Sequence, residues 1–183
     1  MRSTSFNIKK MTYLAILTAI VVVLQTVFAP MIGGLTGLSP ALVLIPIVLG
    51  VATCGLGAGA WLGAVFSFIV MFDPTTVPFW EYRPLMTILL VFLKGVGSGV
   101  IAGLLYKLIE KKNRYAAIIV AAISAPVVNT GIFVLGCLAF FLELTGIGVF
   151  GLFITANFGV ELALNAVLVP IIYRILDVTK VSS

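Results

Sequence analysis

The chain alternates long apolar runs with short breaks that contain glycine, proline or charge. From Met11 to Phe72 it carries no charged side chain, a stretch of 62 residues. One membrane-spanning helix needs about 20 apolar residues, so this stretch is long enough for three crossings. No alternating ten-residue pattern typical of a transmembrane barrel is present. The pattern therefore predicts an all-α integral membrane protein.

The breaks predict a six-transmembrane-helix bundle that forms a single transmembrane domain over residues 1–183. Five spans is the competing count, because the turn at Cys54 to Gly57 between the second and third spans can be placed at several positions. The predicted spans are residues 10–28, 38–53, 56–72, 84–109, 115–142 and 150–176.

Composition and charge fix the class and the orientation. The chain is 62% hydrophobic and 9% charged, which excludes a soluble domain of ordinary composition. Six spans put only Arg83 on one face and nine basic residues on the other, so both termini are predicted to be cytoplasmic. No basic domain lies outside the membrane, so we expect lipid and no nucleic acid as a charged partner. The nine are Arg2, Lys9, Lys10, Lys107, Lys111, Lys112, Arg114, Arg174 and Lys180.

Two charged side chains lie deep inside predicted spans. Lys94 and Glu161 are ten or eleven residues from the outer ends of their helices, about 15–17 Å at 1.5 Å per residue. An ionisable group at this depth is costly unless it is paired or faces a polar cavity. We therefore predict that they lie at one level, that a direct ion pair keeps both ionised, and that they belong to a substrate site.

Polar residues on two further segments extend this prediction. Asn157, Glu161 and Asn165 recur every four residues and share one helix face, while Asn129 and Thr130 follow Pro126, which cannot donate a backbone hydrogen bond. The alternative interpretation is a structural ion pair with asparagines that tie helices together. The predicted substrate-binding residues are Lys94, Asn129, Thr130, Asn157, Glu161 and Asn165.

The outer loops add candidates at the rim of the site. In the loop of residues 73–83, Trp80, Tyr82 and Arg83 are predicted to cover a ligand, and the alternative is an interfacial aromatic belt with a Glu81–Arg83 cluster. The glycine-rich, uncharged segment 29–38 is either a mobile lid or a plain connection.

Small residues at a spacing of four predict close helix packing on the third and fourth spans. These are Gly59, Gly63, Gly95, Gly99 and Gly103. Ala15 and Ala19 repeat the spacing on the first span, where the residues alone favour internal packing.

The order and spacing of these features resemble the substrate-binding membrane subunits, or S components, of energy-coupling factor (ECF) vitamin transporters. The segments that carry the resemblance are residues 38–50, 57–60, 126–131 and 157–165. It implies a multi-pass protein of the bacterial plasma membrane with a vitamin site in the outer half of the bundle. It also implies partners, a transmembrane coupling subunit and two ATPase subunits, so this chain is expected not to be an enzyme. Ala15 and Ala19 would then form the surface that docks on the coupling subunit.

The choice of substrate rests on Lys94 and Arg83, which offer cations for a carboxylate. This favours pantothenate, with riboflavin or folate next, and Trp80 and Tyr82 would suit a flat ring. A solitary proton-coupled carrier in which Glu161 titrates is the main alternative, followed by a homo-oligomeric structural or channel protein. An intramembrane enzyme is disfavoured because the chain has no histidine, and neither a metal nor another cofactor is expected.

Overall fold

The computed structural model describes residues 8–36, 41–145 and 147–178, and these ranges form a bundle of helices without a strand. Arg2 and Lys180 of the predicted basic face, and residues 38–40 of the second predicted span, lie outside the described residues. The elements are α1 Ile8–Val23, η1 Leu24–Phe28, α2 Ala29–Thr36, α3 Leu44–Cys54, α4 Leu56–Val70, η2 Pro74–Thr76, α5 Val77–Tyr82, α6 Pro84–Ile109, α7 Arg114–Phe140, α8 Leu142–Thr145 and α9 Ile147–Val178.

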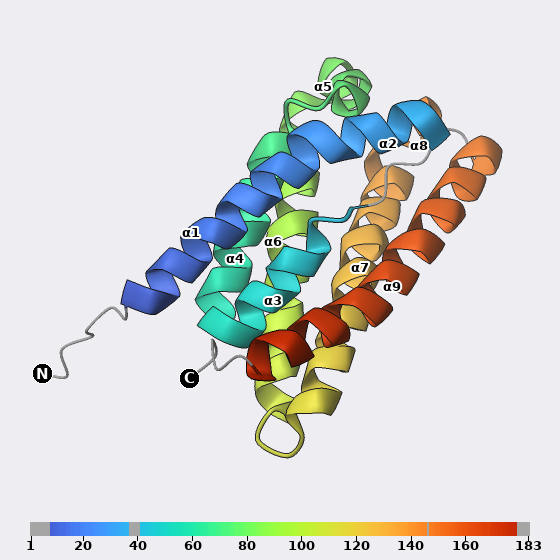
Figure 1. The fold of residues 1–183 in the computed structure, drawn as a ribbon. Coiled ribbons are helices and arrows are strands. Elements are labelled where there is room, and N and C mark those ends of the chain that lie inside the picture. The colour runs from blue at the N-terminus through green and yellow to red at the C-terminus, as the bar shows by residue number, and fades with distance from the viewer. Residues whose placement is uncertain (1–7, 37–40, 146, 179–183) are drawn as a thin grey trace, which may run out of the picture.

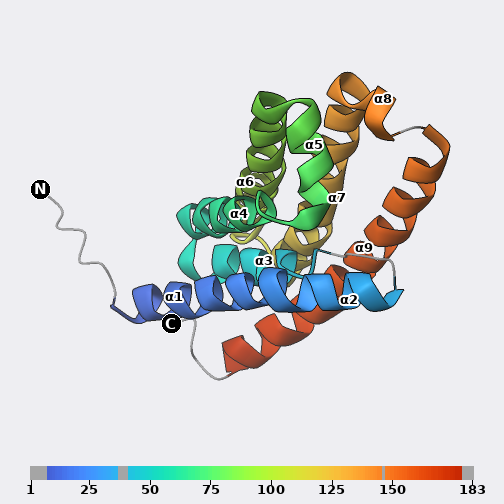
Figure 2. The ribbon, with the colours of Figure 1, turned by 90° about the horizontal axis from the view of Figure 1, so that it is seen from above.

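A short apolar helix lies at the centre of the bundle. α3 packs against α1, α4, α6, α7 and α9, and seven of its eleven residues are buried. Figures 1 and 2 show α3 between the rod formed by α1 and α2 on one side and α4, α6 and α7 on the other. The elements α2, α5 and α8 lie at the upper end in Figure 1, and the α3–α4 and α6–α7 turns lie at the lower end.

The first span is longer than the sequence predicts. A π-helical turn joins α1 to α2, so the chain stays helical from Ile8 to Thr36, and the segment expected as a connecting loop from residue 29 is helical as far as Thr36. The N–H of Ala29 donates to the carbonyl of Leu24, five residues earlier. Pro30 has no N–H to donate to the carbonyl four residues before it, and the wider turn lets the helix continue past this position.

The predicted close packing of the small residues on the third and fourth spans is confirmed, and the structure shows that these two helices, α4 and α6, pack on each other. A Cβ on Gly63 would collide with the backbone carbonyl of Gly95, and one on Gly99 with that of Gly59. Backbones approach this closely only where side chains are missing, as in small-residue motifs of membrane helices. The hydroxyl of Ser67 adds a link by donating to the carbonyl of Val91 at 2.9 Å.

Four described helical stretches are long and apolar enough to cross a membrane. They are Ile8–Ile32, Pro84–Ile109, Arg114–Phe140 and Ala156–Leu176. Leu56–Val70 and Pro74–Tyr82 meet at 75° and together qualify as a fifth span. The predicted second span contains only the eleven-residue α3, about 16 Å long, which is roughly half the thickness of a hydrocarbon core. By length and composition the described ranges therefore contain four or five candidate spans, against the six predicted for the whole chain.

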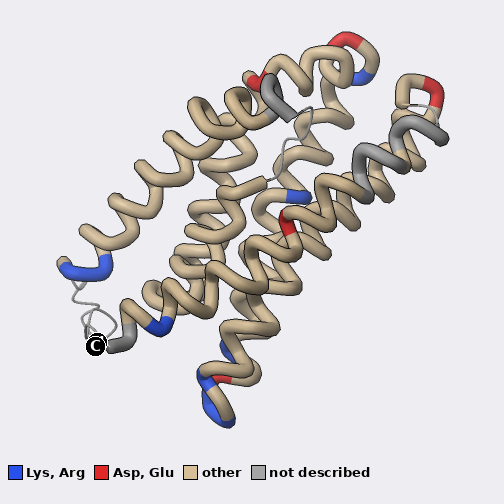
Figure 3. The backbone as a smooth tube through the Cα atoms, turned by 45° about the vertical axis from the view of Figure 1, so that its right-hand side comes forward, with Lys and Arg blue, Asp and Glu red and all other residues tan. Residues whose placement is uncertain are grey.

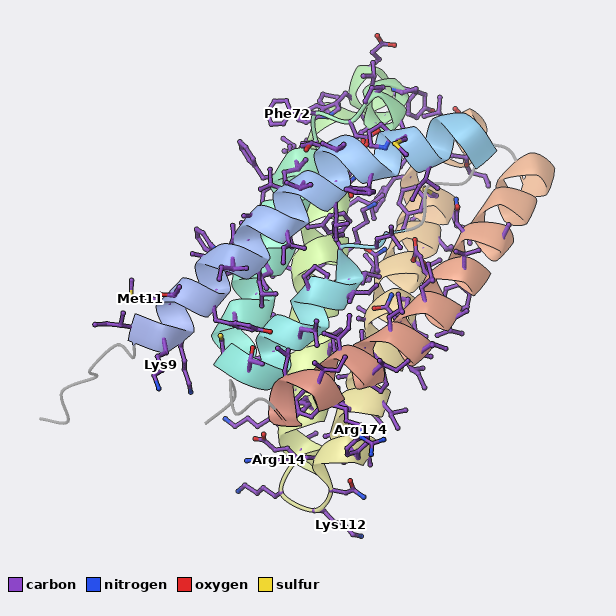
Figure 4. The ribbon with its side chains drawn as sticks, viewed as in Figure 1. Lys9, Met11, Phe72, Lys112, Arg114 and Arg174 are labelled. Atoms are coloured by element: carbon purple, nitrogen blue, oxygen red, sulfur yellow. The ribbon has the colours of Figure 1, made fainter. Side chains whose placement is uncertain are left out.

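Charged residues collect at the two ends of the bundle. Figure 3 shows most basic positions at the end that holds the start of α1 and the α6–α7 turn. Lys9, Lys112, Arg114 and Arg174 all lie at this end in Figure 4, and Phe72 lies at the other. Between the ends, Figure 3 shows one basic and one acidic position at mid-height.

Candidate functional site

A cavity of about 450 Å³ opens among the upper halves of α4, α6, α7 and α9. Residues from η1, η2, α5 and α8 contribute to its walls, as does Ala41, which precedes α3. Its apolar surface includes Phe66, Phe79 and Phe133. The polar side chains that line it are Gln25, Asp73, Thr75, Thr76, Thr87, Lys94, Asn129, Thr130, Thr145, Asn157 and Glu161. Five of the predicted substrate-binding residues therefore face one space, which is large enough for a small organic solute.

The carboxylate of Glu161 accepts hydrogen bonds from two uncharged groups. Its Oε1 accepts a hydrogen bond from the backbone N–H of Ala41 at 2.9 Å, and its Oε2 accepts one from the Thr130 hydroxyl at 3.3 Å. The side chain is only 6% exposed. Residues 41–43 turn directly into α3, so the carboxylate lies near the positive N-terminal end of that helix, where a negative charge is stabilised.

The ammonium of Lys94 lies between aromatic rings. Its Nζ is 4.7 Å from the ring centroid of Phe133 and 5.9 Å from that of Phe66, both within range of a cation–π contact. Within the described ranges it forms no ion pair with Glu161, so the predicted direct contact is wrong. The reason is that Glu161 already accepts hydrogen bonds from Ala41 and Thr130, which leaves the lysine turned towards the cavity.

The three asparagines have different environments. Asn129 lines the cavity, is 5% exposed, and its Oδ1 has no hydrogen-bond partner among the described residues. Asn157 also lines the cavity. Asn165 is not among the lining residues, and its Nδ2 donates to the backbone carbonyl of Glu161 at 2.9 Å, within the same helix. It therefore lies one turn below the cavity.

The aromatic rim residues lie outside the cavity lining and contact the protein itself. The indole N–H of Trp80 donates to the carbonyl of Met71 at 2.9 Å, and the hydroxyl of Tyr82 donates to Glu143 at 2.6 Å. The guanidinium of Arg83 lies 5.4 Å from the ring centroid of Tyr82. In this arrangement Trp80 joins α5 to the residue that follows α4, and Tyr82 joins α5 to α8 at the upper end of the bundle.

Several groups that line the cavity were not predicted from the sequence. Gln25 and Asp73 meet across the cavity wall, with 3.4 Å between Gln25 Nε2 and Asp73 Oδ2. Gln25 is the one amide side chain within the apolar run of the first span, and that isolation is a signal that could have found it. Asp73 ends the long uncharged stretch, and the sequence predicts it only as part of the loop of residues 73–83. Nothing in the sequence indicates that the backbone N–H of Ala41 contacts Glu161.

A comparison with protein families decides the class of protein to which this cavity belongs. The family model for the substrate-specific component of ECF transporters matches residues 9–173. The chain belongs to this family. It has no match among curated proteins or solved structures. S components are the substrate-binding transport subunits of ECF importers and are not enzymes, so the cavity is interpreted as a binding site.

The S-component family also implies an ECF module as partner. The residues predicted to contact it lie on the face of α1 that points away from the bundle. Ala15 and Ala19 are both exposed on this helix. Thr18, between them, accepts a hydrogen bond at 3.2 Å from the indole of Trp61 on α4. The predicted docking residues thus form a smooth exposed strip beside an exposed indole.

Proposed function

We propose that this S component captures a water-soluble vitamin from outside the cell and that its substrate is pantothenate, with riboflavin and folate as the next candidates. The observation that carries the proposal is the position of Lys94. Its ammonium lies on the cavity between two phenyl rings, and no carboxylate among the described residues contacts it. A ligand carboxylate is the group that would satisfy such a cation best.

The remaining cavity surface suits the rest of the pantothenate molecule. Pantothenate has a carboxylate at one end, an amide in the middle, and two hydroxyls beside a pair of methyl groups. With the carboxylate at Lys94, its hydroxyl and amide hydrogens can donate to the unpartnered Oδ1 of Asn129. The methyl groups can pack on Phe66 or Phe133. Thr130 and Asn157 complete the polar lining beside these groups.

The proposal includes a topology and partners. We infer six membrane crossings, with α3 and the residues before it as the second, and both termini in the cytoplasm of a bacterial cell. Most basic residues lie at the end of the bundle that holds the start of α1, in agreement with this orientation. A transmembrane coupling subunit would dock on Ala15 and Ala19, and two ATPase subunits would supply the energy. A carrier working alone would keep taking up vitamin without those subunits, and this proposal predicts that it does not.

Binding assays on the purified chain test the substrate. Pantothenate is compared with pantothenol, in which the carboxylate is replaced by a hydroxymethyl group, and with riboflavin and folate. We expect pantothenate to bind at micromolar affinity or better and pantothenol about 10–100-fold more weakly, because a hydrogen bond to a charged group contributes about 1.5–3 kcal/mol.

The variant Lys94→Met should bind both compounds equally weakly, whereas Lys107→Met, at the other end of the bundle, should retain the preference for pantothenate. Tight binding of riboflavin or folate with no response to pantothenate would refute the substrate assignment. The absence of binding by every vitamin tested would refute the vitamin-binding function itself.

A further inference from the structure

A second pocket, of about 290 Å³, lies at the opposite end of the bundle from the vitamin cavity. The start of α1, the turn between α3 and α4, and the end of α6 surround it. Its walls include Lys10, Thr53, Tyr106, Lys107 and Glu110. None of these residues lines the first cavity, so the two sites are separate.

The charges in this pocket favour an anion. The ammonium groups of Lys10 and Lys107 come from different helices, and neither forms an ion pair or hydrogen bond within the described part of the chain. Glu110 supplies one negative charge, so the three groups sum to one positive charge. Gly55, which precedes α4, provides no side-chain cap and its carbonyl accepts only from the N–H of Ala58, which leaves the N–H of Leu56, a residue that lines the pocket, without a cap. These donors match the oxygens of a phosphate group.

The surroundings of the pocket favour a phosphate that a membrane lipid carries. Leu108 follows Lys107 directly and is 74% exposed, and Leu104, one turn earlier, is also exposed. Met11 follows Lys10 and is exposed as well. Each lysine thus lies next to apolar side chains on which acyl chains can pack, an arrangement that a free phosphate ion would not use. Basic pockets between membrane helices are typical sites for anionic lipid headgroups.

We propose that the pocket formed by Lys10, Lys107 and the α3–α4 turn binds the phosphate headgroup of an anionic membrane lipid. The site holds the start of α1, which carries Ala15 and Ala19, against the ends of α3 and α6. Cys54 strengthens this link, since its Sγ lies 3.6 Å from the carbonyl of Lys10. Lipid binding would therefore fix the end of the helix that presents the proposed docking strip.

Native mass spectrometry on the full chain, released from nanodiscs of phosphatidylcholine with or without phosphatidylglycerol, tests the proposal. We expect wild-type protein to retain phosphatidylglycerol in preference to phosphatidylcholine. The double variant Lys10→Gln/Lys107→Gln should lose about 25-fold in this preference, because each basic residue near an anionic surface contributes about fivefold. Lys10→Arg/Lys107→Arg should keep it.

The matched control is Lys111→Gln/Lys112→Gln, which removes the same charge from the same end of the bundle but from residues outside the pocket. Vitamin binding by each variant checks that the bundle is folded. An equal loss in the control, or no preference in wild type, would overturn the proposal. Displacement of the lipid by millimolar inorganic phosphate would assign the pocket to a free anion and would overturn the lipid assignment.

Discussion

Replacement of Gly63 by alanine tests whether the close approach of α4 and α6 builds the cavity that Lys94 lines, which we propose to bind a vitamin. The new Cβ would collide with the carbonyl oxygen of Gly95 and would lie 2.9 Å from its carbonyl carbon and 3.0 Å from the Cα of Val96. All three atoms are backbone, so no side-chain rotation relieves the contact and the helices must separate by about 0.5 Å or more. Overpacking of this kind costs about 1–3 kcal/mol.

The separation also reaches the ligand site. Gly95 adjoins Lys94 on α6, and Gly63 lies one turn from Phe66 on α4, so movement of the helices widens the gap between the ammonium and that ring. Binding sites need their groups within about 0.5 Å of the productive geometry. We therefore expect Gly63→Ala to weaken vitamin binding as well as to destabilise the bundle.

The control is Gly57→Ala on the same helix, where a Cβ meets nothing within 4 Å. Both variants gain the higher helix propensity of alanine, about 1 kcal/mol, so their comparison isolates the packing cost. Thermal unfolding of the purified proteins in one detergent should give a midpoint about 2–10 °C lower for Gly63→Ala than for Gly57→Ala. Equal midpoints and equal vitamin affinities would show that the helices separate without cost and would refute the reasoning.

Two further experiments test the site and the docking strip formed by Ala15 and Ala19. Glu161→Ala should lower the thermal midpoint more than Glu161→Gln, because only the amide still accepts from the N–H of Ala41 and a buried unpaired donor costs about 1–3 kcal/mol; equal midpoints would exclude this structural role. Ala15→Leu combined with Ala19→Leu should abolish vitamin uptake by cells that express the full transporter but leave vitamin binding intact, whereas Ala163→Leu, at another exposed helix position, should leave both unchanged. Retained uptake in the double variant would place the docking surface elsewhere.

Long helices with clear ends were predictable from the sequence. The predicted span 84–109 coincides with α6, and the span 115–142 lies within two residues of α7. Polar or conformationally restricted residues mark these starts: Pro84 begins α6, and the side chain of Asn113 accepts from the N–H of Ala116 to cap α7. Such signals act locally and are therefore visible in the sequence.

The short central helix and the bent outer segment were not predictable in the same way. The chain from Met11 to Phe72 has no charge, so hydropathy cannot place a boundary within it. α3 ends at Cys54, where Gly55 adopts a φ of +95° in the turn that the sequence predicts, whereas hydropathy does not mark the start of the helix at Leu44. The 75° bend after Val70 occurs where Asp73 caps the next turn by accepting from the N–H of Thr75 at 2.9 Å.

The sequence predicts only those residues of the candidate site whose type is rare within an apolar span. Lys94 and Glu161 are conspicuous because charge is rare inside apolar spans, but the sequence does not specify the partners of these charges. The partner of Glu161 is a backbone N–H 120 residues away, at Ala41. The ion pair was expected because opposite charges at one depth attract, and that argument omits two neutral donors, the N–H of Ala41 before α3 and the hydroxyl of Thr130 on α7.

This difference in partners changes what the site can do. In a direct Lys94–Glu161 pair each charge would neutralise the other, and a ligand carboxylate would have to displace Glu161 at a large desolvation cost. In the observed arrangement Glu161 accepts from Ala41 and Thr130, while Lys94 faces phenyl rings that supply no oxygen acceptor. An incoming carboxylate can then bind the side chain of Lys94 without breaking an existing ion pair. The arrangement therefore agrees better with the proposed binding of a ligand carboxylate than with a purely structural role for the two charges.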